Sequence, residues 1–335
     1  MEEDASKVPV VSVIIPVLNG EEYLESIVGH VMSQTFDYWE IVIVVSSRCT
    51  DSTPDIARRL SDGDRVRVVD YVDTGALGGS KNAGLDESRG RYVWFLDVDD
   101  IPSSLYLSTL VEIAERESAD VVGCNYLYSV ERGPFEDPKG EFSVDVMDSR
   151  EALRRRATER FPVASWSMIY RRSMIFDNGI RFEDGFSEDI SFTVRSLMAS
   201  GTVCYCHRPL YKYMRTPGSI CQSSRDSRGR SEVDRYNHLE ASLHPEDPDR
   251  DFLARRFTLT RMRSAGHMTF KGFLEYVYSD EYLEMVSRNR SPQVCFECAC
   301  QYVVPYIYFG SIRLFFRIYY YNSGRYFTHL RRKLR

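Results

Sequence analysis

The sequence predicts an α/β protein, in which helices cover a sheet, followed by a mainly helical C-terminal region. Two observations predict this class. Over the first hundred residues, β-branched apolar runs alternate with stretches whose apolar residues recur at helical spacing. The residues from 249 to 335 are rich in Tyr, Phe and Arg and are expected to be mainly helical. With 335 residues, of which 43% are hydrophobic, the chain has ample material for a core.

The expected elements of the first half follow one another along the chain. Val10–Ile15 is a β-branched run that stops at Pro16, and apolar residues between Leu24 and Met32 then fall on one helical face. Ile41–Val45 predicts a second buried strand. The elements after it are expected to be a helix over 53–60, a strand over 66–69, a glycine-rich segment and helix over 76–87, and a strand over 92–96. This alternation predicts a parallel sheet with ligands at the carboxyl ends of its strands.

Composition excludes some classes of protein and predicts a location. The formal charge of −6 argues against a nucleic-acid-binding protein. The acidic N-terminus lacks the apolar core of a signal peptide, and the longest uncharged run, Cys298–Ile312, is shorter than the ~18–20 residues that cross a bilayer. The eight cysteines form no evident extracellular disulfide framework. We therefore expect a reduced, cytoplasmic protein.

Three regions are expected along the chain: an α/β domain over 1–222, a polar linker or flap over 223–248, and a helical region over 249–335. The last region mixes bulky apolar and basic residues between Ile312 and Tyr321. This composition fits an interfacial helix on anionic lipid, and hence a peripheral membrane contact. It fits equally a helix that packs on its own domain and exposes its arginines.

A hydrophobic strand that ends in three carboxylates is the most informative feature of the chain. Trp94 and the two apolar residues after it run directly into Asp97, Asp99 and Asp100. Clustered carboxylates repel one another and resist removal from water, and a divalent cation offsets both costs. Oxygen ligands of this kind suit Mg²⁺ or Mn²⁺, with phosphate oxygens completing the shell. The alternative is an Asp-rich turn whose last Asp caps a helix that begins near Ser103.

Four further segments accompany this Asp-x-Asp-Asp element in a fixed order. The five segments are Val11–Leu24, Leu77–Gly84, Gly90–Asp100, Phe186–Phe192 and Pro209–Ile220. Together they resemble family 2 glycosyltransferases over residues 8 to about 222. The resemblance implies the GT-A fold of nucleotide-diphospho-sugar transferases, a Rossmann-like mixed sheet flanked by helices. Phe161–Arg172 is similar to a segment of capsule and exopolysaccharide glycosyltransferases.

The resemblance also implies an activity. It is the inverting, metal-dependent transfer of a sugar from a nucleotide-diphospho-sugar donor to a hydroxyl of a glycan or lipid-linked acceptor. Such transfer serves cell-surface polysaccharide or glycolipid synthesis, on the inner face of the cell membrane. Mg²⁺ or Mn²⁺ is the implied cofactor, with Asp99 as principal ligand. Asp97 would be a second ligand or face the ribose or sugar, with Asp100 in support.

Catalytic roles follow from the same resemblance for Asp189 and Glu188. Asp189 would take the proton of the acceptor hydroxyl as general base, a contribution of ~10²–10⁴-fold, and Glu188 would shape its surroundings. The alternative for this pair is a helix N-terminus, where acidic residues are favoured and Ser187 is a candidate N-cap.

The donor site is expected to draw on several of these segments. The predicted donor-binding residues are Pro16, Val17, Asn19, Glu21, Ser46, Ser47, Lys81, Asp97 and Arg215. Ser46 and Ser47 stand where the family has acidic residues, one of which recognises the nucleotide base, so the base that is recognised here stays open. Lys81 stands where the family often has Arg. It would meet the diphosphate as a point charge, or else lie on the surface at a helix start.

The acceptor site is represented by one predicted residue, Trp166. Its ring would stack on a sugar, and the alternative is a tryptophan buried in the core.

Two other classes of function stay open. The altered segment at Ser46 and Ser47 supports a non-catalytic nucleotide-sugar-binding or scaffold protein, although retention of Asp97, Asp99 and Asp189 counts against it. An Asp–metal site on an α/β sheet also suits a nucleotidyltransferase. That chemistry has no need of the carboxylates at 188 and 189.

Overall fold

The computed structural model describes most of the chain, in two compact units. The described residues are 8–73, 75, 77–158, 161–162, 164–185, 187–215, 225–265, 268–289 and 291–303. Unit 1 comprises Met1–Ala152 and Pro162–Thr216, and unit 2 comprises Leu153–Phe161 and Pro217–Arg335. The predicted membrane-contacting stretch after Ile312 lies outside the described residues, so that expectation stays a prediction.

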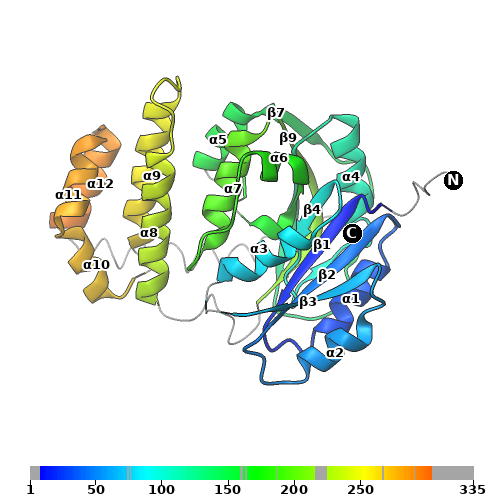
Figure 1. Ribbon diagram of the computed structural model, residues 1–335. Helices are drawn as coiled ribbons and strands as arrows, with labels where there is room; N and C mark the ends of the chain where they lie inside the picture. The colour runs from blue at the N-terminus through cyan, green and yellow to red at the C-terminus, as the bar shows by residue number, and fades with distance from the viewer. Residues whose placement is uncertain are drawn as a thin grey trace. The chain divides into compact units, whose positions relative to one another are not determined.

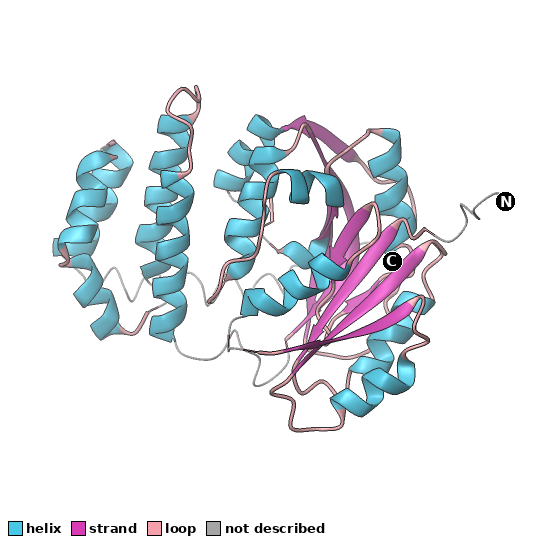
Figure 2. Ribbon diagram, viewed as in Figure 1, coloured by secondary structure: helices cyan, strands magenta, loops and turns pink. Residues whose placement is uncertain are grey.

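A mixed sheet forms the centre of unit 1 (Figures 1 and 2). Its strands within the described residues are β1 (Val11–Val17), β2 (Trp39–Ser46), β3 (Val66–Tyr71), β4 (Tyr92–Phe95), β5 (Ile101–Pro102), β6 (Val121–Ser129), β7 (Val144–Asp148), β8 (Met168–Arg171) and β9 (Thr202–Met214). Their order is β3-β2-β1-β4-β8-β6-β9-β5, with β7 paired to β9. Strands β3, β2, β1 and β4 are mutually parallel, whereas β8 is antiparallel to both β4 and β6.

Helices cover both faces of this sheet, as the α/β prediction requires. Figure 1 shows α1, α2 and α4 on one face and α3, α6 and α7 on the other. The helices of unit 1 are α1 (Leu24–Met32), α2 (Thr53–Leu60), α3 (Leu77–Glu87), α4 (Tyr106–Arg116), α6 (Arg172–Asp177) and α7 (Glu188–Ala199), with a short 3-10 helix η2 (Ser165–Ser167); α5 (Ser149–Ala157) begins in unit 1 and ends in unit 2. The α/β class and the first four strands are therefore confirmed.

Side chains alternate between the two faces along each strand, which is why both faces are apolar. Val13 and Ile15 of β1 join the core beneath α1, α2 and α4. The residue between them, Ile14, faces α3, where Gly84 allows the helix to approach closely. A Cβ at Gly84 would lie 2.3 Å from Cγ2 of Ile14 and 2.9 Å from Cγ2 of Val44. The glycine therefore sets the distance between α3 and the sheet.

Unit 2 is helical within its described residues. Beyond the end of α5, its helices are α8 (Arg225–Ala241), α9 (Arg250–Ser264), α10 (Phe270–Val277), α11 (Asp280–Arg288) and α12 (Pro292–Val303). They share a core that includes Val233, Met262, Phe273, Tyr282 and Val294. Among the described residues, no helix combines the length and the apolar character needed to cross a bilayer.

The polar linker or flap predicted over 223–248 is wrong for most of its length, because α8 occupies Arg225–Ala241. Val233, Tyr236 and Leu239 recur every third residue along this helix and are buried. Ser, Arg and Asp residues around them make the segment polar on average. Composition therefore hid an apolar spacing that was itself typical of a helix.

The close approach of α3 predicts opposite effects of two glycine-to-alanine substitutions. Gly84→Ala should lower the free energy of unfolding of unit 1 by about 1–3 kcal/mol, because the added methyl group overlaps side chains of β1 and β2. Gly29→Ala is the matched control. Gly29 is an exposed position inside α1 with nothing within 4 Å of an added Cβ, so alanine should stabilise by roughly 0.5–1 kcal/mol.

Urea unfolding followed by tryptophan fluorescence measures both effects. The three tryptophans, Trp39, Trp94 and Trp166, all belong to unit 1, so the signal reports this unit. Equal effects of the two substitutions would contradict the close approach.

Candidate functional site

The strand order brings one predicted cluster together at the carboxyl end of β4. Asp97 and Asp99 follow this strand, and β8 runs antiparallel beside it, with Trp94 paired to Ile169. Because neighbouring antiparallel strands place the start of one beside the end of the other, the 3-10 helix before β8 lies next to the carboxylates. Ser165 enters the site from that helix.

Lys81 is the centre of this site. Its ammonium group donates to Oε1 of Glu188 and to Oδ1 of Asp189, both at 2.8 Å. Only 5% of Lys81 is exposed, so its interpretation as a surface residue is wrong. Burial lowers the pKa of Lys81, but the negative charges of Asp189 and Glu188 outweigh burial and raise the pKa well above its usual value. A charged lysine thus joins α3 to the first turn of α7.

Asp189 is held in one orientation by two further bonds from Ser165. The Ser165 hydroxyl donates to Oδ1 of Asp189 at 2.7 Å, and its backbone N–H lies 3.3 Å from Oδ2. Oδ1 therefore accepts two strong bonds, and Oδ2 keeps capacity to accept another. The sequence analysis missed Ser165, because no motif in it marks a serine before Trp166. The alternative for Glu188 and Asp189 is correct as to place, since both lie in the first turn of α7, yet Ser187 makes no side-chain cap there.

Asp97 belongs to the same electrostatic group. Burial away from water raises the pKa of Asp97 to about 7, and the positive charge of Lys81 acts against this rise. The nearby negative charges of Asp189, Asp99 and Glu188 raise it further. Three carboxylates, those of Asp97, Glu188 and Asp189, therefore interact with one lysine, and the carboxylate of Asp99 acts on Asp97.

Asp100 is a buried structural residue. Its Oδ2 accepts from the hydroxyl of Tyr211 and its Oδ1 from the backbone N–H of Met214, both at 2.7 Å. Burial raises the pKa of Asp100 well above its usual value. Helix α4 begins only at Tyr106 and has no side-chain cap, so the interpretation of Asp100 as a cap is wrong. Its carboxyl instead attaches the turn after β4 to the end of β9.

Ser46 and Ser47 lie elsewhere on the same edge of the sheet, at the carboxyl end of β2. The Ser46 hydroxyl donates to Oδ2 of Asp73 at 2.7 Å, and the backbone N–H of Asp73 donates to Oγ of Ser47 at 3.0 Å. Asp73 follows β3, the neighbouring strand. Sequence reasoning missed it, although a carboxylate just after a strand end was the signal that singled out Asp97.

The residues predicted after β1 attach this strand to the segment after β2. Asn19 adopts the left-handed conformation, with φ 52°, and its Oδ1 accepts from the backbone N–H of Thr50 at 2.8 Å. Oε2 of Glu21 accepts from the backbone N–H of Ser52 at 2.9 Å. Val17 is buried in the core, with half-buried Pro16 before it. Donor binding by these four residues stays a prediction.

Trp166 is a core residue. Only 7% of it is exposed, and its ring packs nearly parallel to Tyr211 and Tyr213, at 4.6 and 5.1 Å between centroids. Its backbone carbonyl accepts from Nε1 of Trp94 at 2.8 Å. The core interpretation therefore replaces the predicted sugar-stacking role, because the ring has little free surface left for a sugar.

Two arginines lie near the carboxyl edge. Arg215, predicted to contact phosphate, is exposed at the end of β9, with its guanidinium 5.6 Å from the ring of Tyr128. Arg132, which the sequence analysis missed, is exposed and donates to the backbone carbonyl of Asp99 at 3.0 Å. Its guanidinium lies over the ring of Tyr23 at 4.1 Å.

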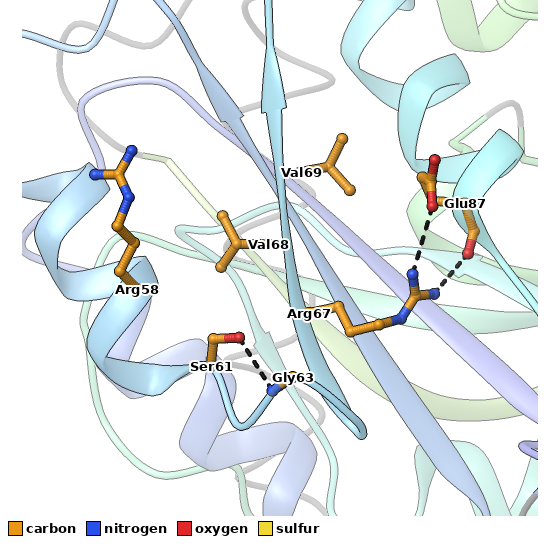
Figure 3. A pocket seen from close by; sticks show the side chains of 7 residues that line it. All are labelled: Arg58, Ser61, Gly63, Arg67, Val68, Val69 and Glu87. Atoms are coloured by element: carbon orange, nitrogen blue, oxygen red, sulfur yellow. Dashed lines mark hydrogen bonds and ion pairs between the residues drawn. The ribbon is translucent and has the colours of Figure 1, made fainter.

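One pocket of unit 1 lies away from this edge. It has a volume of about 560 Å³ beside edge strand β3, and Figure 3 shows its lining residues Arg58, Ser61, Gly63, Arg67, Val68, Val69 and Glu87. None of these seven is a predicted site residue. In the described part of the chain, no three His, Cys, Asp or Glu side chains are arranged to hold a metal ion by themselves.

Comparison with known proteins identifies the family. Residues 12–178 match the profile of Glycosyl transferase family 2. The uncharacterized glycosyltransferase EpsJ of Bacillus subtilis is 31% identical over 229 residues, which cover 64% of this chain and 64% of EpsJ. The chain therefore spans less than two thirds of this curated relative.

Two solved structures share the fold. Residues 1–349 of TarS from S. aureus, in complex with UDP-GlcNAc, match with a TM-score of 0.57 and 17% identity, over 83% of this chain and 88% of that one. The mannosyltransferase PcManGT of Pyrobaculum calidifontis, in complex with GDP-Man and Mn²⁺, matches with a TM-score of 0.55 and 16% identity, over 91% and 86%. The predicted GT-A fold is confirmed, and the chain belongs to glycosyl transferase family 2.

Proposed function

We propose that the protein transfers a sugar from a nucleotide-diphospho-sugar to a hydroxyl group, with inversion and with Mg²⁺ or Mn²⁺. One observation carries this proposal. Glu188, Asp189 and Asp97 interact with Lys81 at the carboxyl edge of the sheet, where ligands of α/β proteins bind, and Asp99 adds its negative charge beside Asp97. Family membership supports it, and so do the donor complexes of TarS and PcManGT, two proteins of the same fold.

The carboxylates after β4 fit a divalent cation. The pKa of Asp97 is raised first by burial away from water and then by the negative charges of Asp189, Asp99 and Glu188, and the positive charge of Lys81 does not offset this rise. Asp99 and Asp97 would hold the ion through oxygen ligands, in the number that Mg²⁺ and Mn²⁺ usually take from protein beside substrate phosphates. When bound, the ion supplies positive charge where the leaving diphosphate develops negative charge.

The residues of α7 fit the other half of the reaction. The acceptor hydroxyl must lose a proton as it attacks, and Oδ2 of Asp189 has capacity to accept it. Lys81 and Ser165 both bind Oδ1, so they fix the direction in which Oδ2 points. Glu188 also accepts a hydrogen bond from Lys81, so the positive charge of the lysine is divided between Glu188 and Asp189. The acceptor proposed is a glycan or a lipid-linked acceptor of cell-surface polysaccharide or glycolipid synthesis, on the resemblance of residues 161–172 to capsule and exopolysaccharide glycosyltransferases.

Asp189→Asn tests the proposed base. The amide keeps the size of the side chain and cannot take a proton, so turnover should fall by about 10²–10⁴-fold, with donor affinity within a few-fold of wild type. Release of nucleoside diphosphate from a panel of nucleotide sugars measures turnover, with lipid extract as acceptor source, and calorimetry measures affinity. Asp177→Asn, at an exposed position on α6, is the control. Unchanged turnover in Asp189→Asn would contradict the role and favour the scaffold alternative.

Asp99→Asn tests the metal ligand. Loss of one charged oxygen ligand should raise the Mn²⁺ concentration for half-maximal turnover by at least about tenfold. Titration of activity with Mn²⁺ after treatment with a chelator measures this. Turnover by the wild-type protein that survives the chelator undiminished would show that the reaction needs no metal.

Asp97→Asn tests the unfavourable surroundings of the Asp97 carboxylate through the pH dependence of the free energy of unfolding. With the pKa of Asp97 at about 7 in the folded state and about 3.9 unfolded, the folded state binds more protons between these values. Wild-type stability should therefore fall as pH rises from about 4 to 7 by more than that of the variant. Above pH 7, Asp97→Asn should be the more stable protein, by on the order of a few kcal/mol.

Urea unfolding at several pH values, in the presence of a chelator, measures this difference. Asp64→Asn, at an exposed loop position, should follow the wild-type profile. Parallel profiles for wild type and Asp97→Asn would show that the Asp97 carboxylate has no such unfavourable surroundings.

A further inference from the structure

The carboxyl end of β2 and β3 holds polar groups that the proposed chemistry does not use. Ser46 and Ser47 lie at the end of β2, two strands away from β4 and Asp97 in the order β3-β2-β1-β4, and Asp73, which follows β3, is hydrogen-bonded to both serines. Two strand spacings amount to about 10 Å, which an extended nucleotide bridges. On the opposite side of β4, the ring of Trp166 packs with Tyr211 and Tyr213 and fills the space. The rest of a nucleotide whose diphosphate lies at β4 therefore extends toward β2 and β3.

Asp73 is held in place by three hydrogen bonds. Its Oδ2 accepts from the Ser46 hydroxyl at 2.7 Å, and its Oδ1 accepts from the backbone N–H of Gly75 at 2.6 Å. Its own N–H donates to Oγ of Ser47. Each carboxylate oxygen can accept two bonds, so both oxygens have capacity for a ligand. Asp73 is half-buried, whereas Ser46 is buried and gives its one hydroxyl proton to Asp73.

We propose that Asp73 reads the base of the donor nucleotide, and that Ser46 positions it. This inference rests on the proposed function. A fixed carboxylate accepts hydrogen bonds and offers none, so it selects bases with a ring N–H: uracil, thymine or guanine. Cytosine and adenine present a ring nitrogen that itself accepts, and two acceptors facing each other lose a bond. The carboxylate that the sequence lacks after β2 is thus supplied from the neighbouring strand.

Calorimetric titration with UDP, GDP, CDP and ADP in the presence of Mg²⁺ tests the proposal. The wild-type protein should bind UDP or GDP at least about tenfold more tightly than CDP and ADP. Asp73→Asn should weaken the preferred nucleotide by about tenfold or more and reduce its preference over CDP, because the amide can donate to the cytosine ring nitrogen. Asp70→Asn is the matched control. It changes an exposed carboxylate three residues earlier on β3 and should bind like wild type.

A double exchange separates base reading from a merely structural role. Ser46→Asp combined with Asp73→Ser returns the carboxylate to β2 and should restore the preference of the wild-type protein. If the affinities of Asp73→Asn for the four nucleotides keep the ratios of the wild-type protein, the inference is overturned. This holds whether the four affinities stay the same or all fall by the same factor. Binding of none of them by the wild-type protein would overturn the proposed function itself. Binding and turnover with an unaltered preference in Asp73→Asn would leave that function standing and remove only the role of Asp73.

Discussion

The site depends on a buried ammonium group that two carboxylates share. Lys81 comes from α3, Glu188 and Asp189 from α7, and Ser165 from the segment before β8, so one charge network joins three parts of the chain. Buried ions repay their desolvation only when their partners are well placed, and removal of one partner leaves an uncompensated charge. The packing of α3 on β1 and β2, through Gly84, therefore decides where the lysine and its carboxylates can meet.

The change of strand direction at β8 places the second half of the site. The carboxyl ends of the four parallel strands β1 to β4 lie at one edge of the sheet. If β8 were also parallel to them, Ser165, which precedes β8, would lie at the opposite edge. Because β8 runs antiparallel to β4, the 3-10 helix before it reaches Asp189. The same reversal buries Trp166 between the tyrosines of β9, where its carbonyl binds Trp94 and Tyr106. Core and site are thus built from adjacent residues of one segment.

Sequence periodicity predicted the first four strands and their helices, because each buried run is apolar and bounded by a turn. It also predicted that Asp97 follows a strand. Ser165 and Asp73 were beyond its reach, since their roles depend on partners 24 and 27 residues away. The predicted sugar-stacking role of Trp166 was wrong for a related reason. An aromatic residue beside polar residues gives the same sequence pattern whether its ring is buried or exposed. Helix α8 was missed because average polarity was weighed above the spacing of three apolar residues.

Strand order also has a consequence for how such a protein can diversify. The turn after β4 is attached to β9 through Asp100 and cannot move without disturbing the core. Asp73, directly after β3, is held by hydrogen bonds to Ser46 and Ser47. Mutations accumulate most easily where few contacts must change together. Substitutions at Asp73 and its serine partners therefore disturb fewer contacts than substitutions in the turn after β4. New ligand preferences can arise there without loss of the charge network around Lys81.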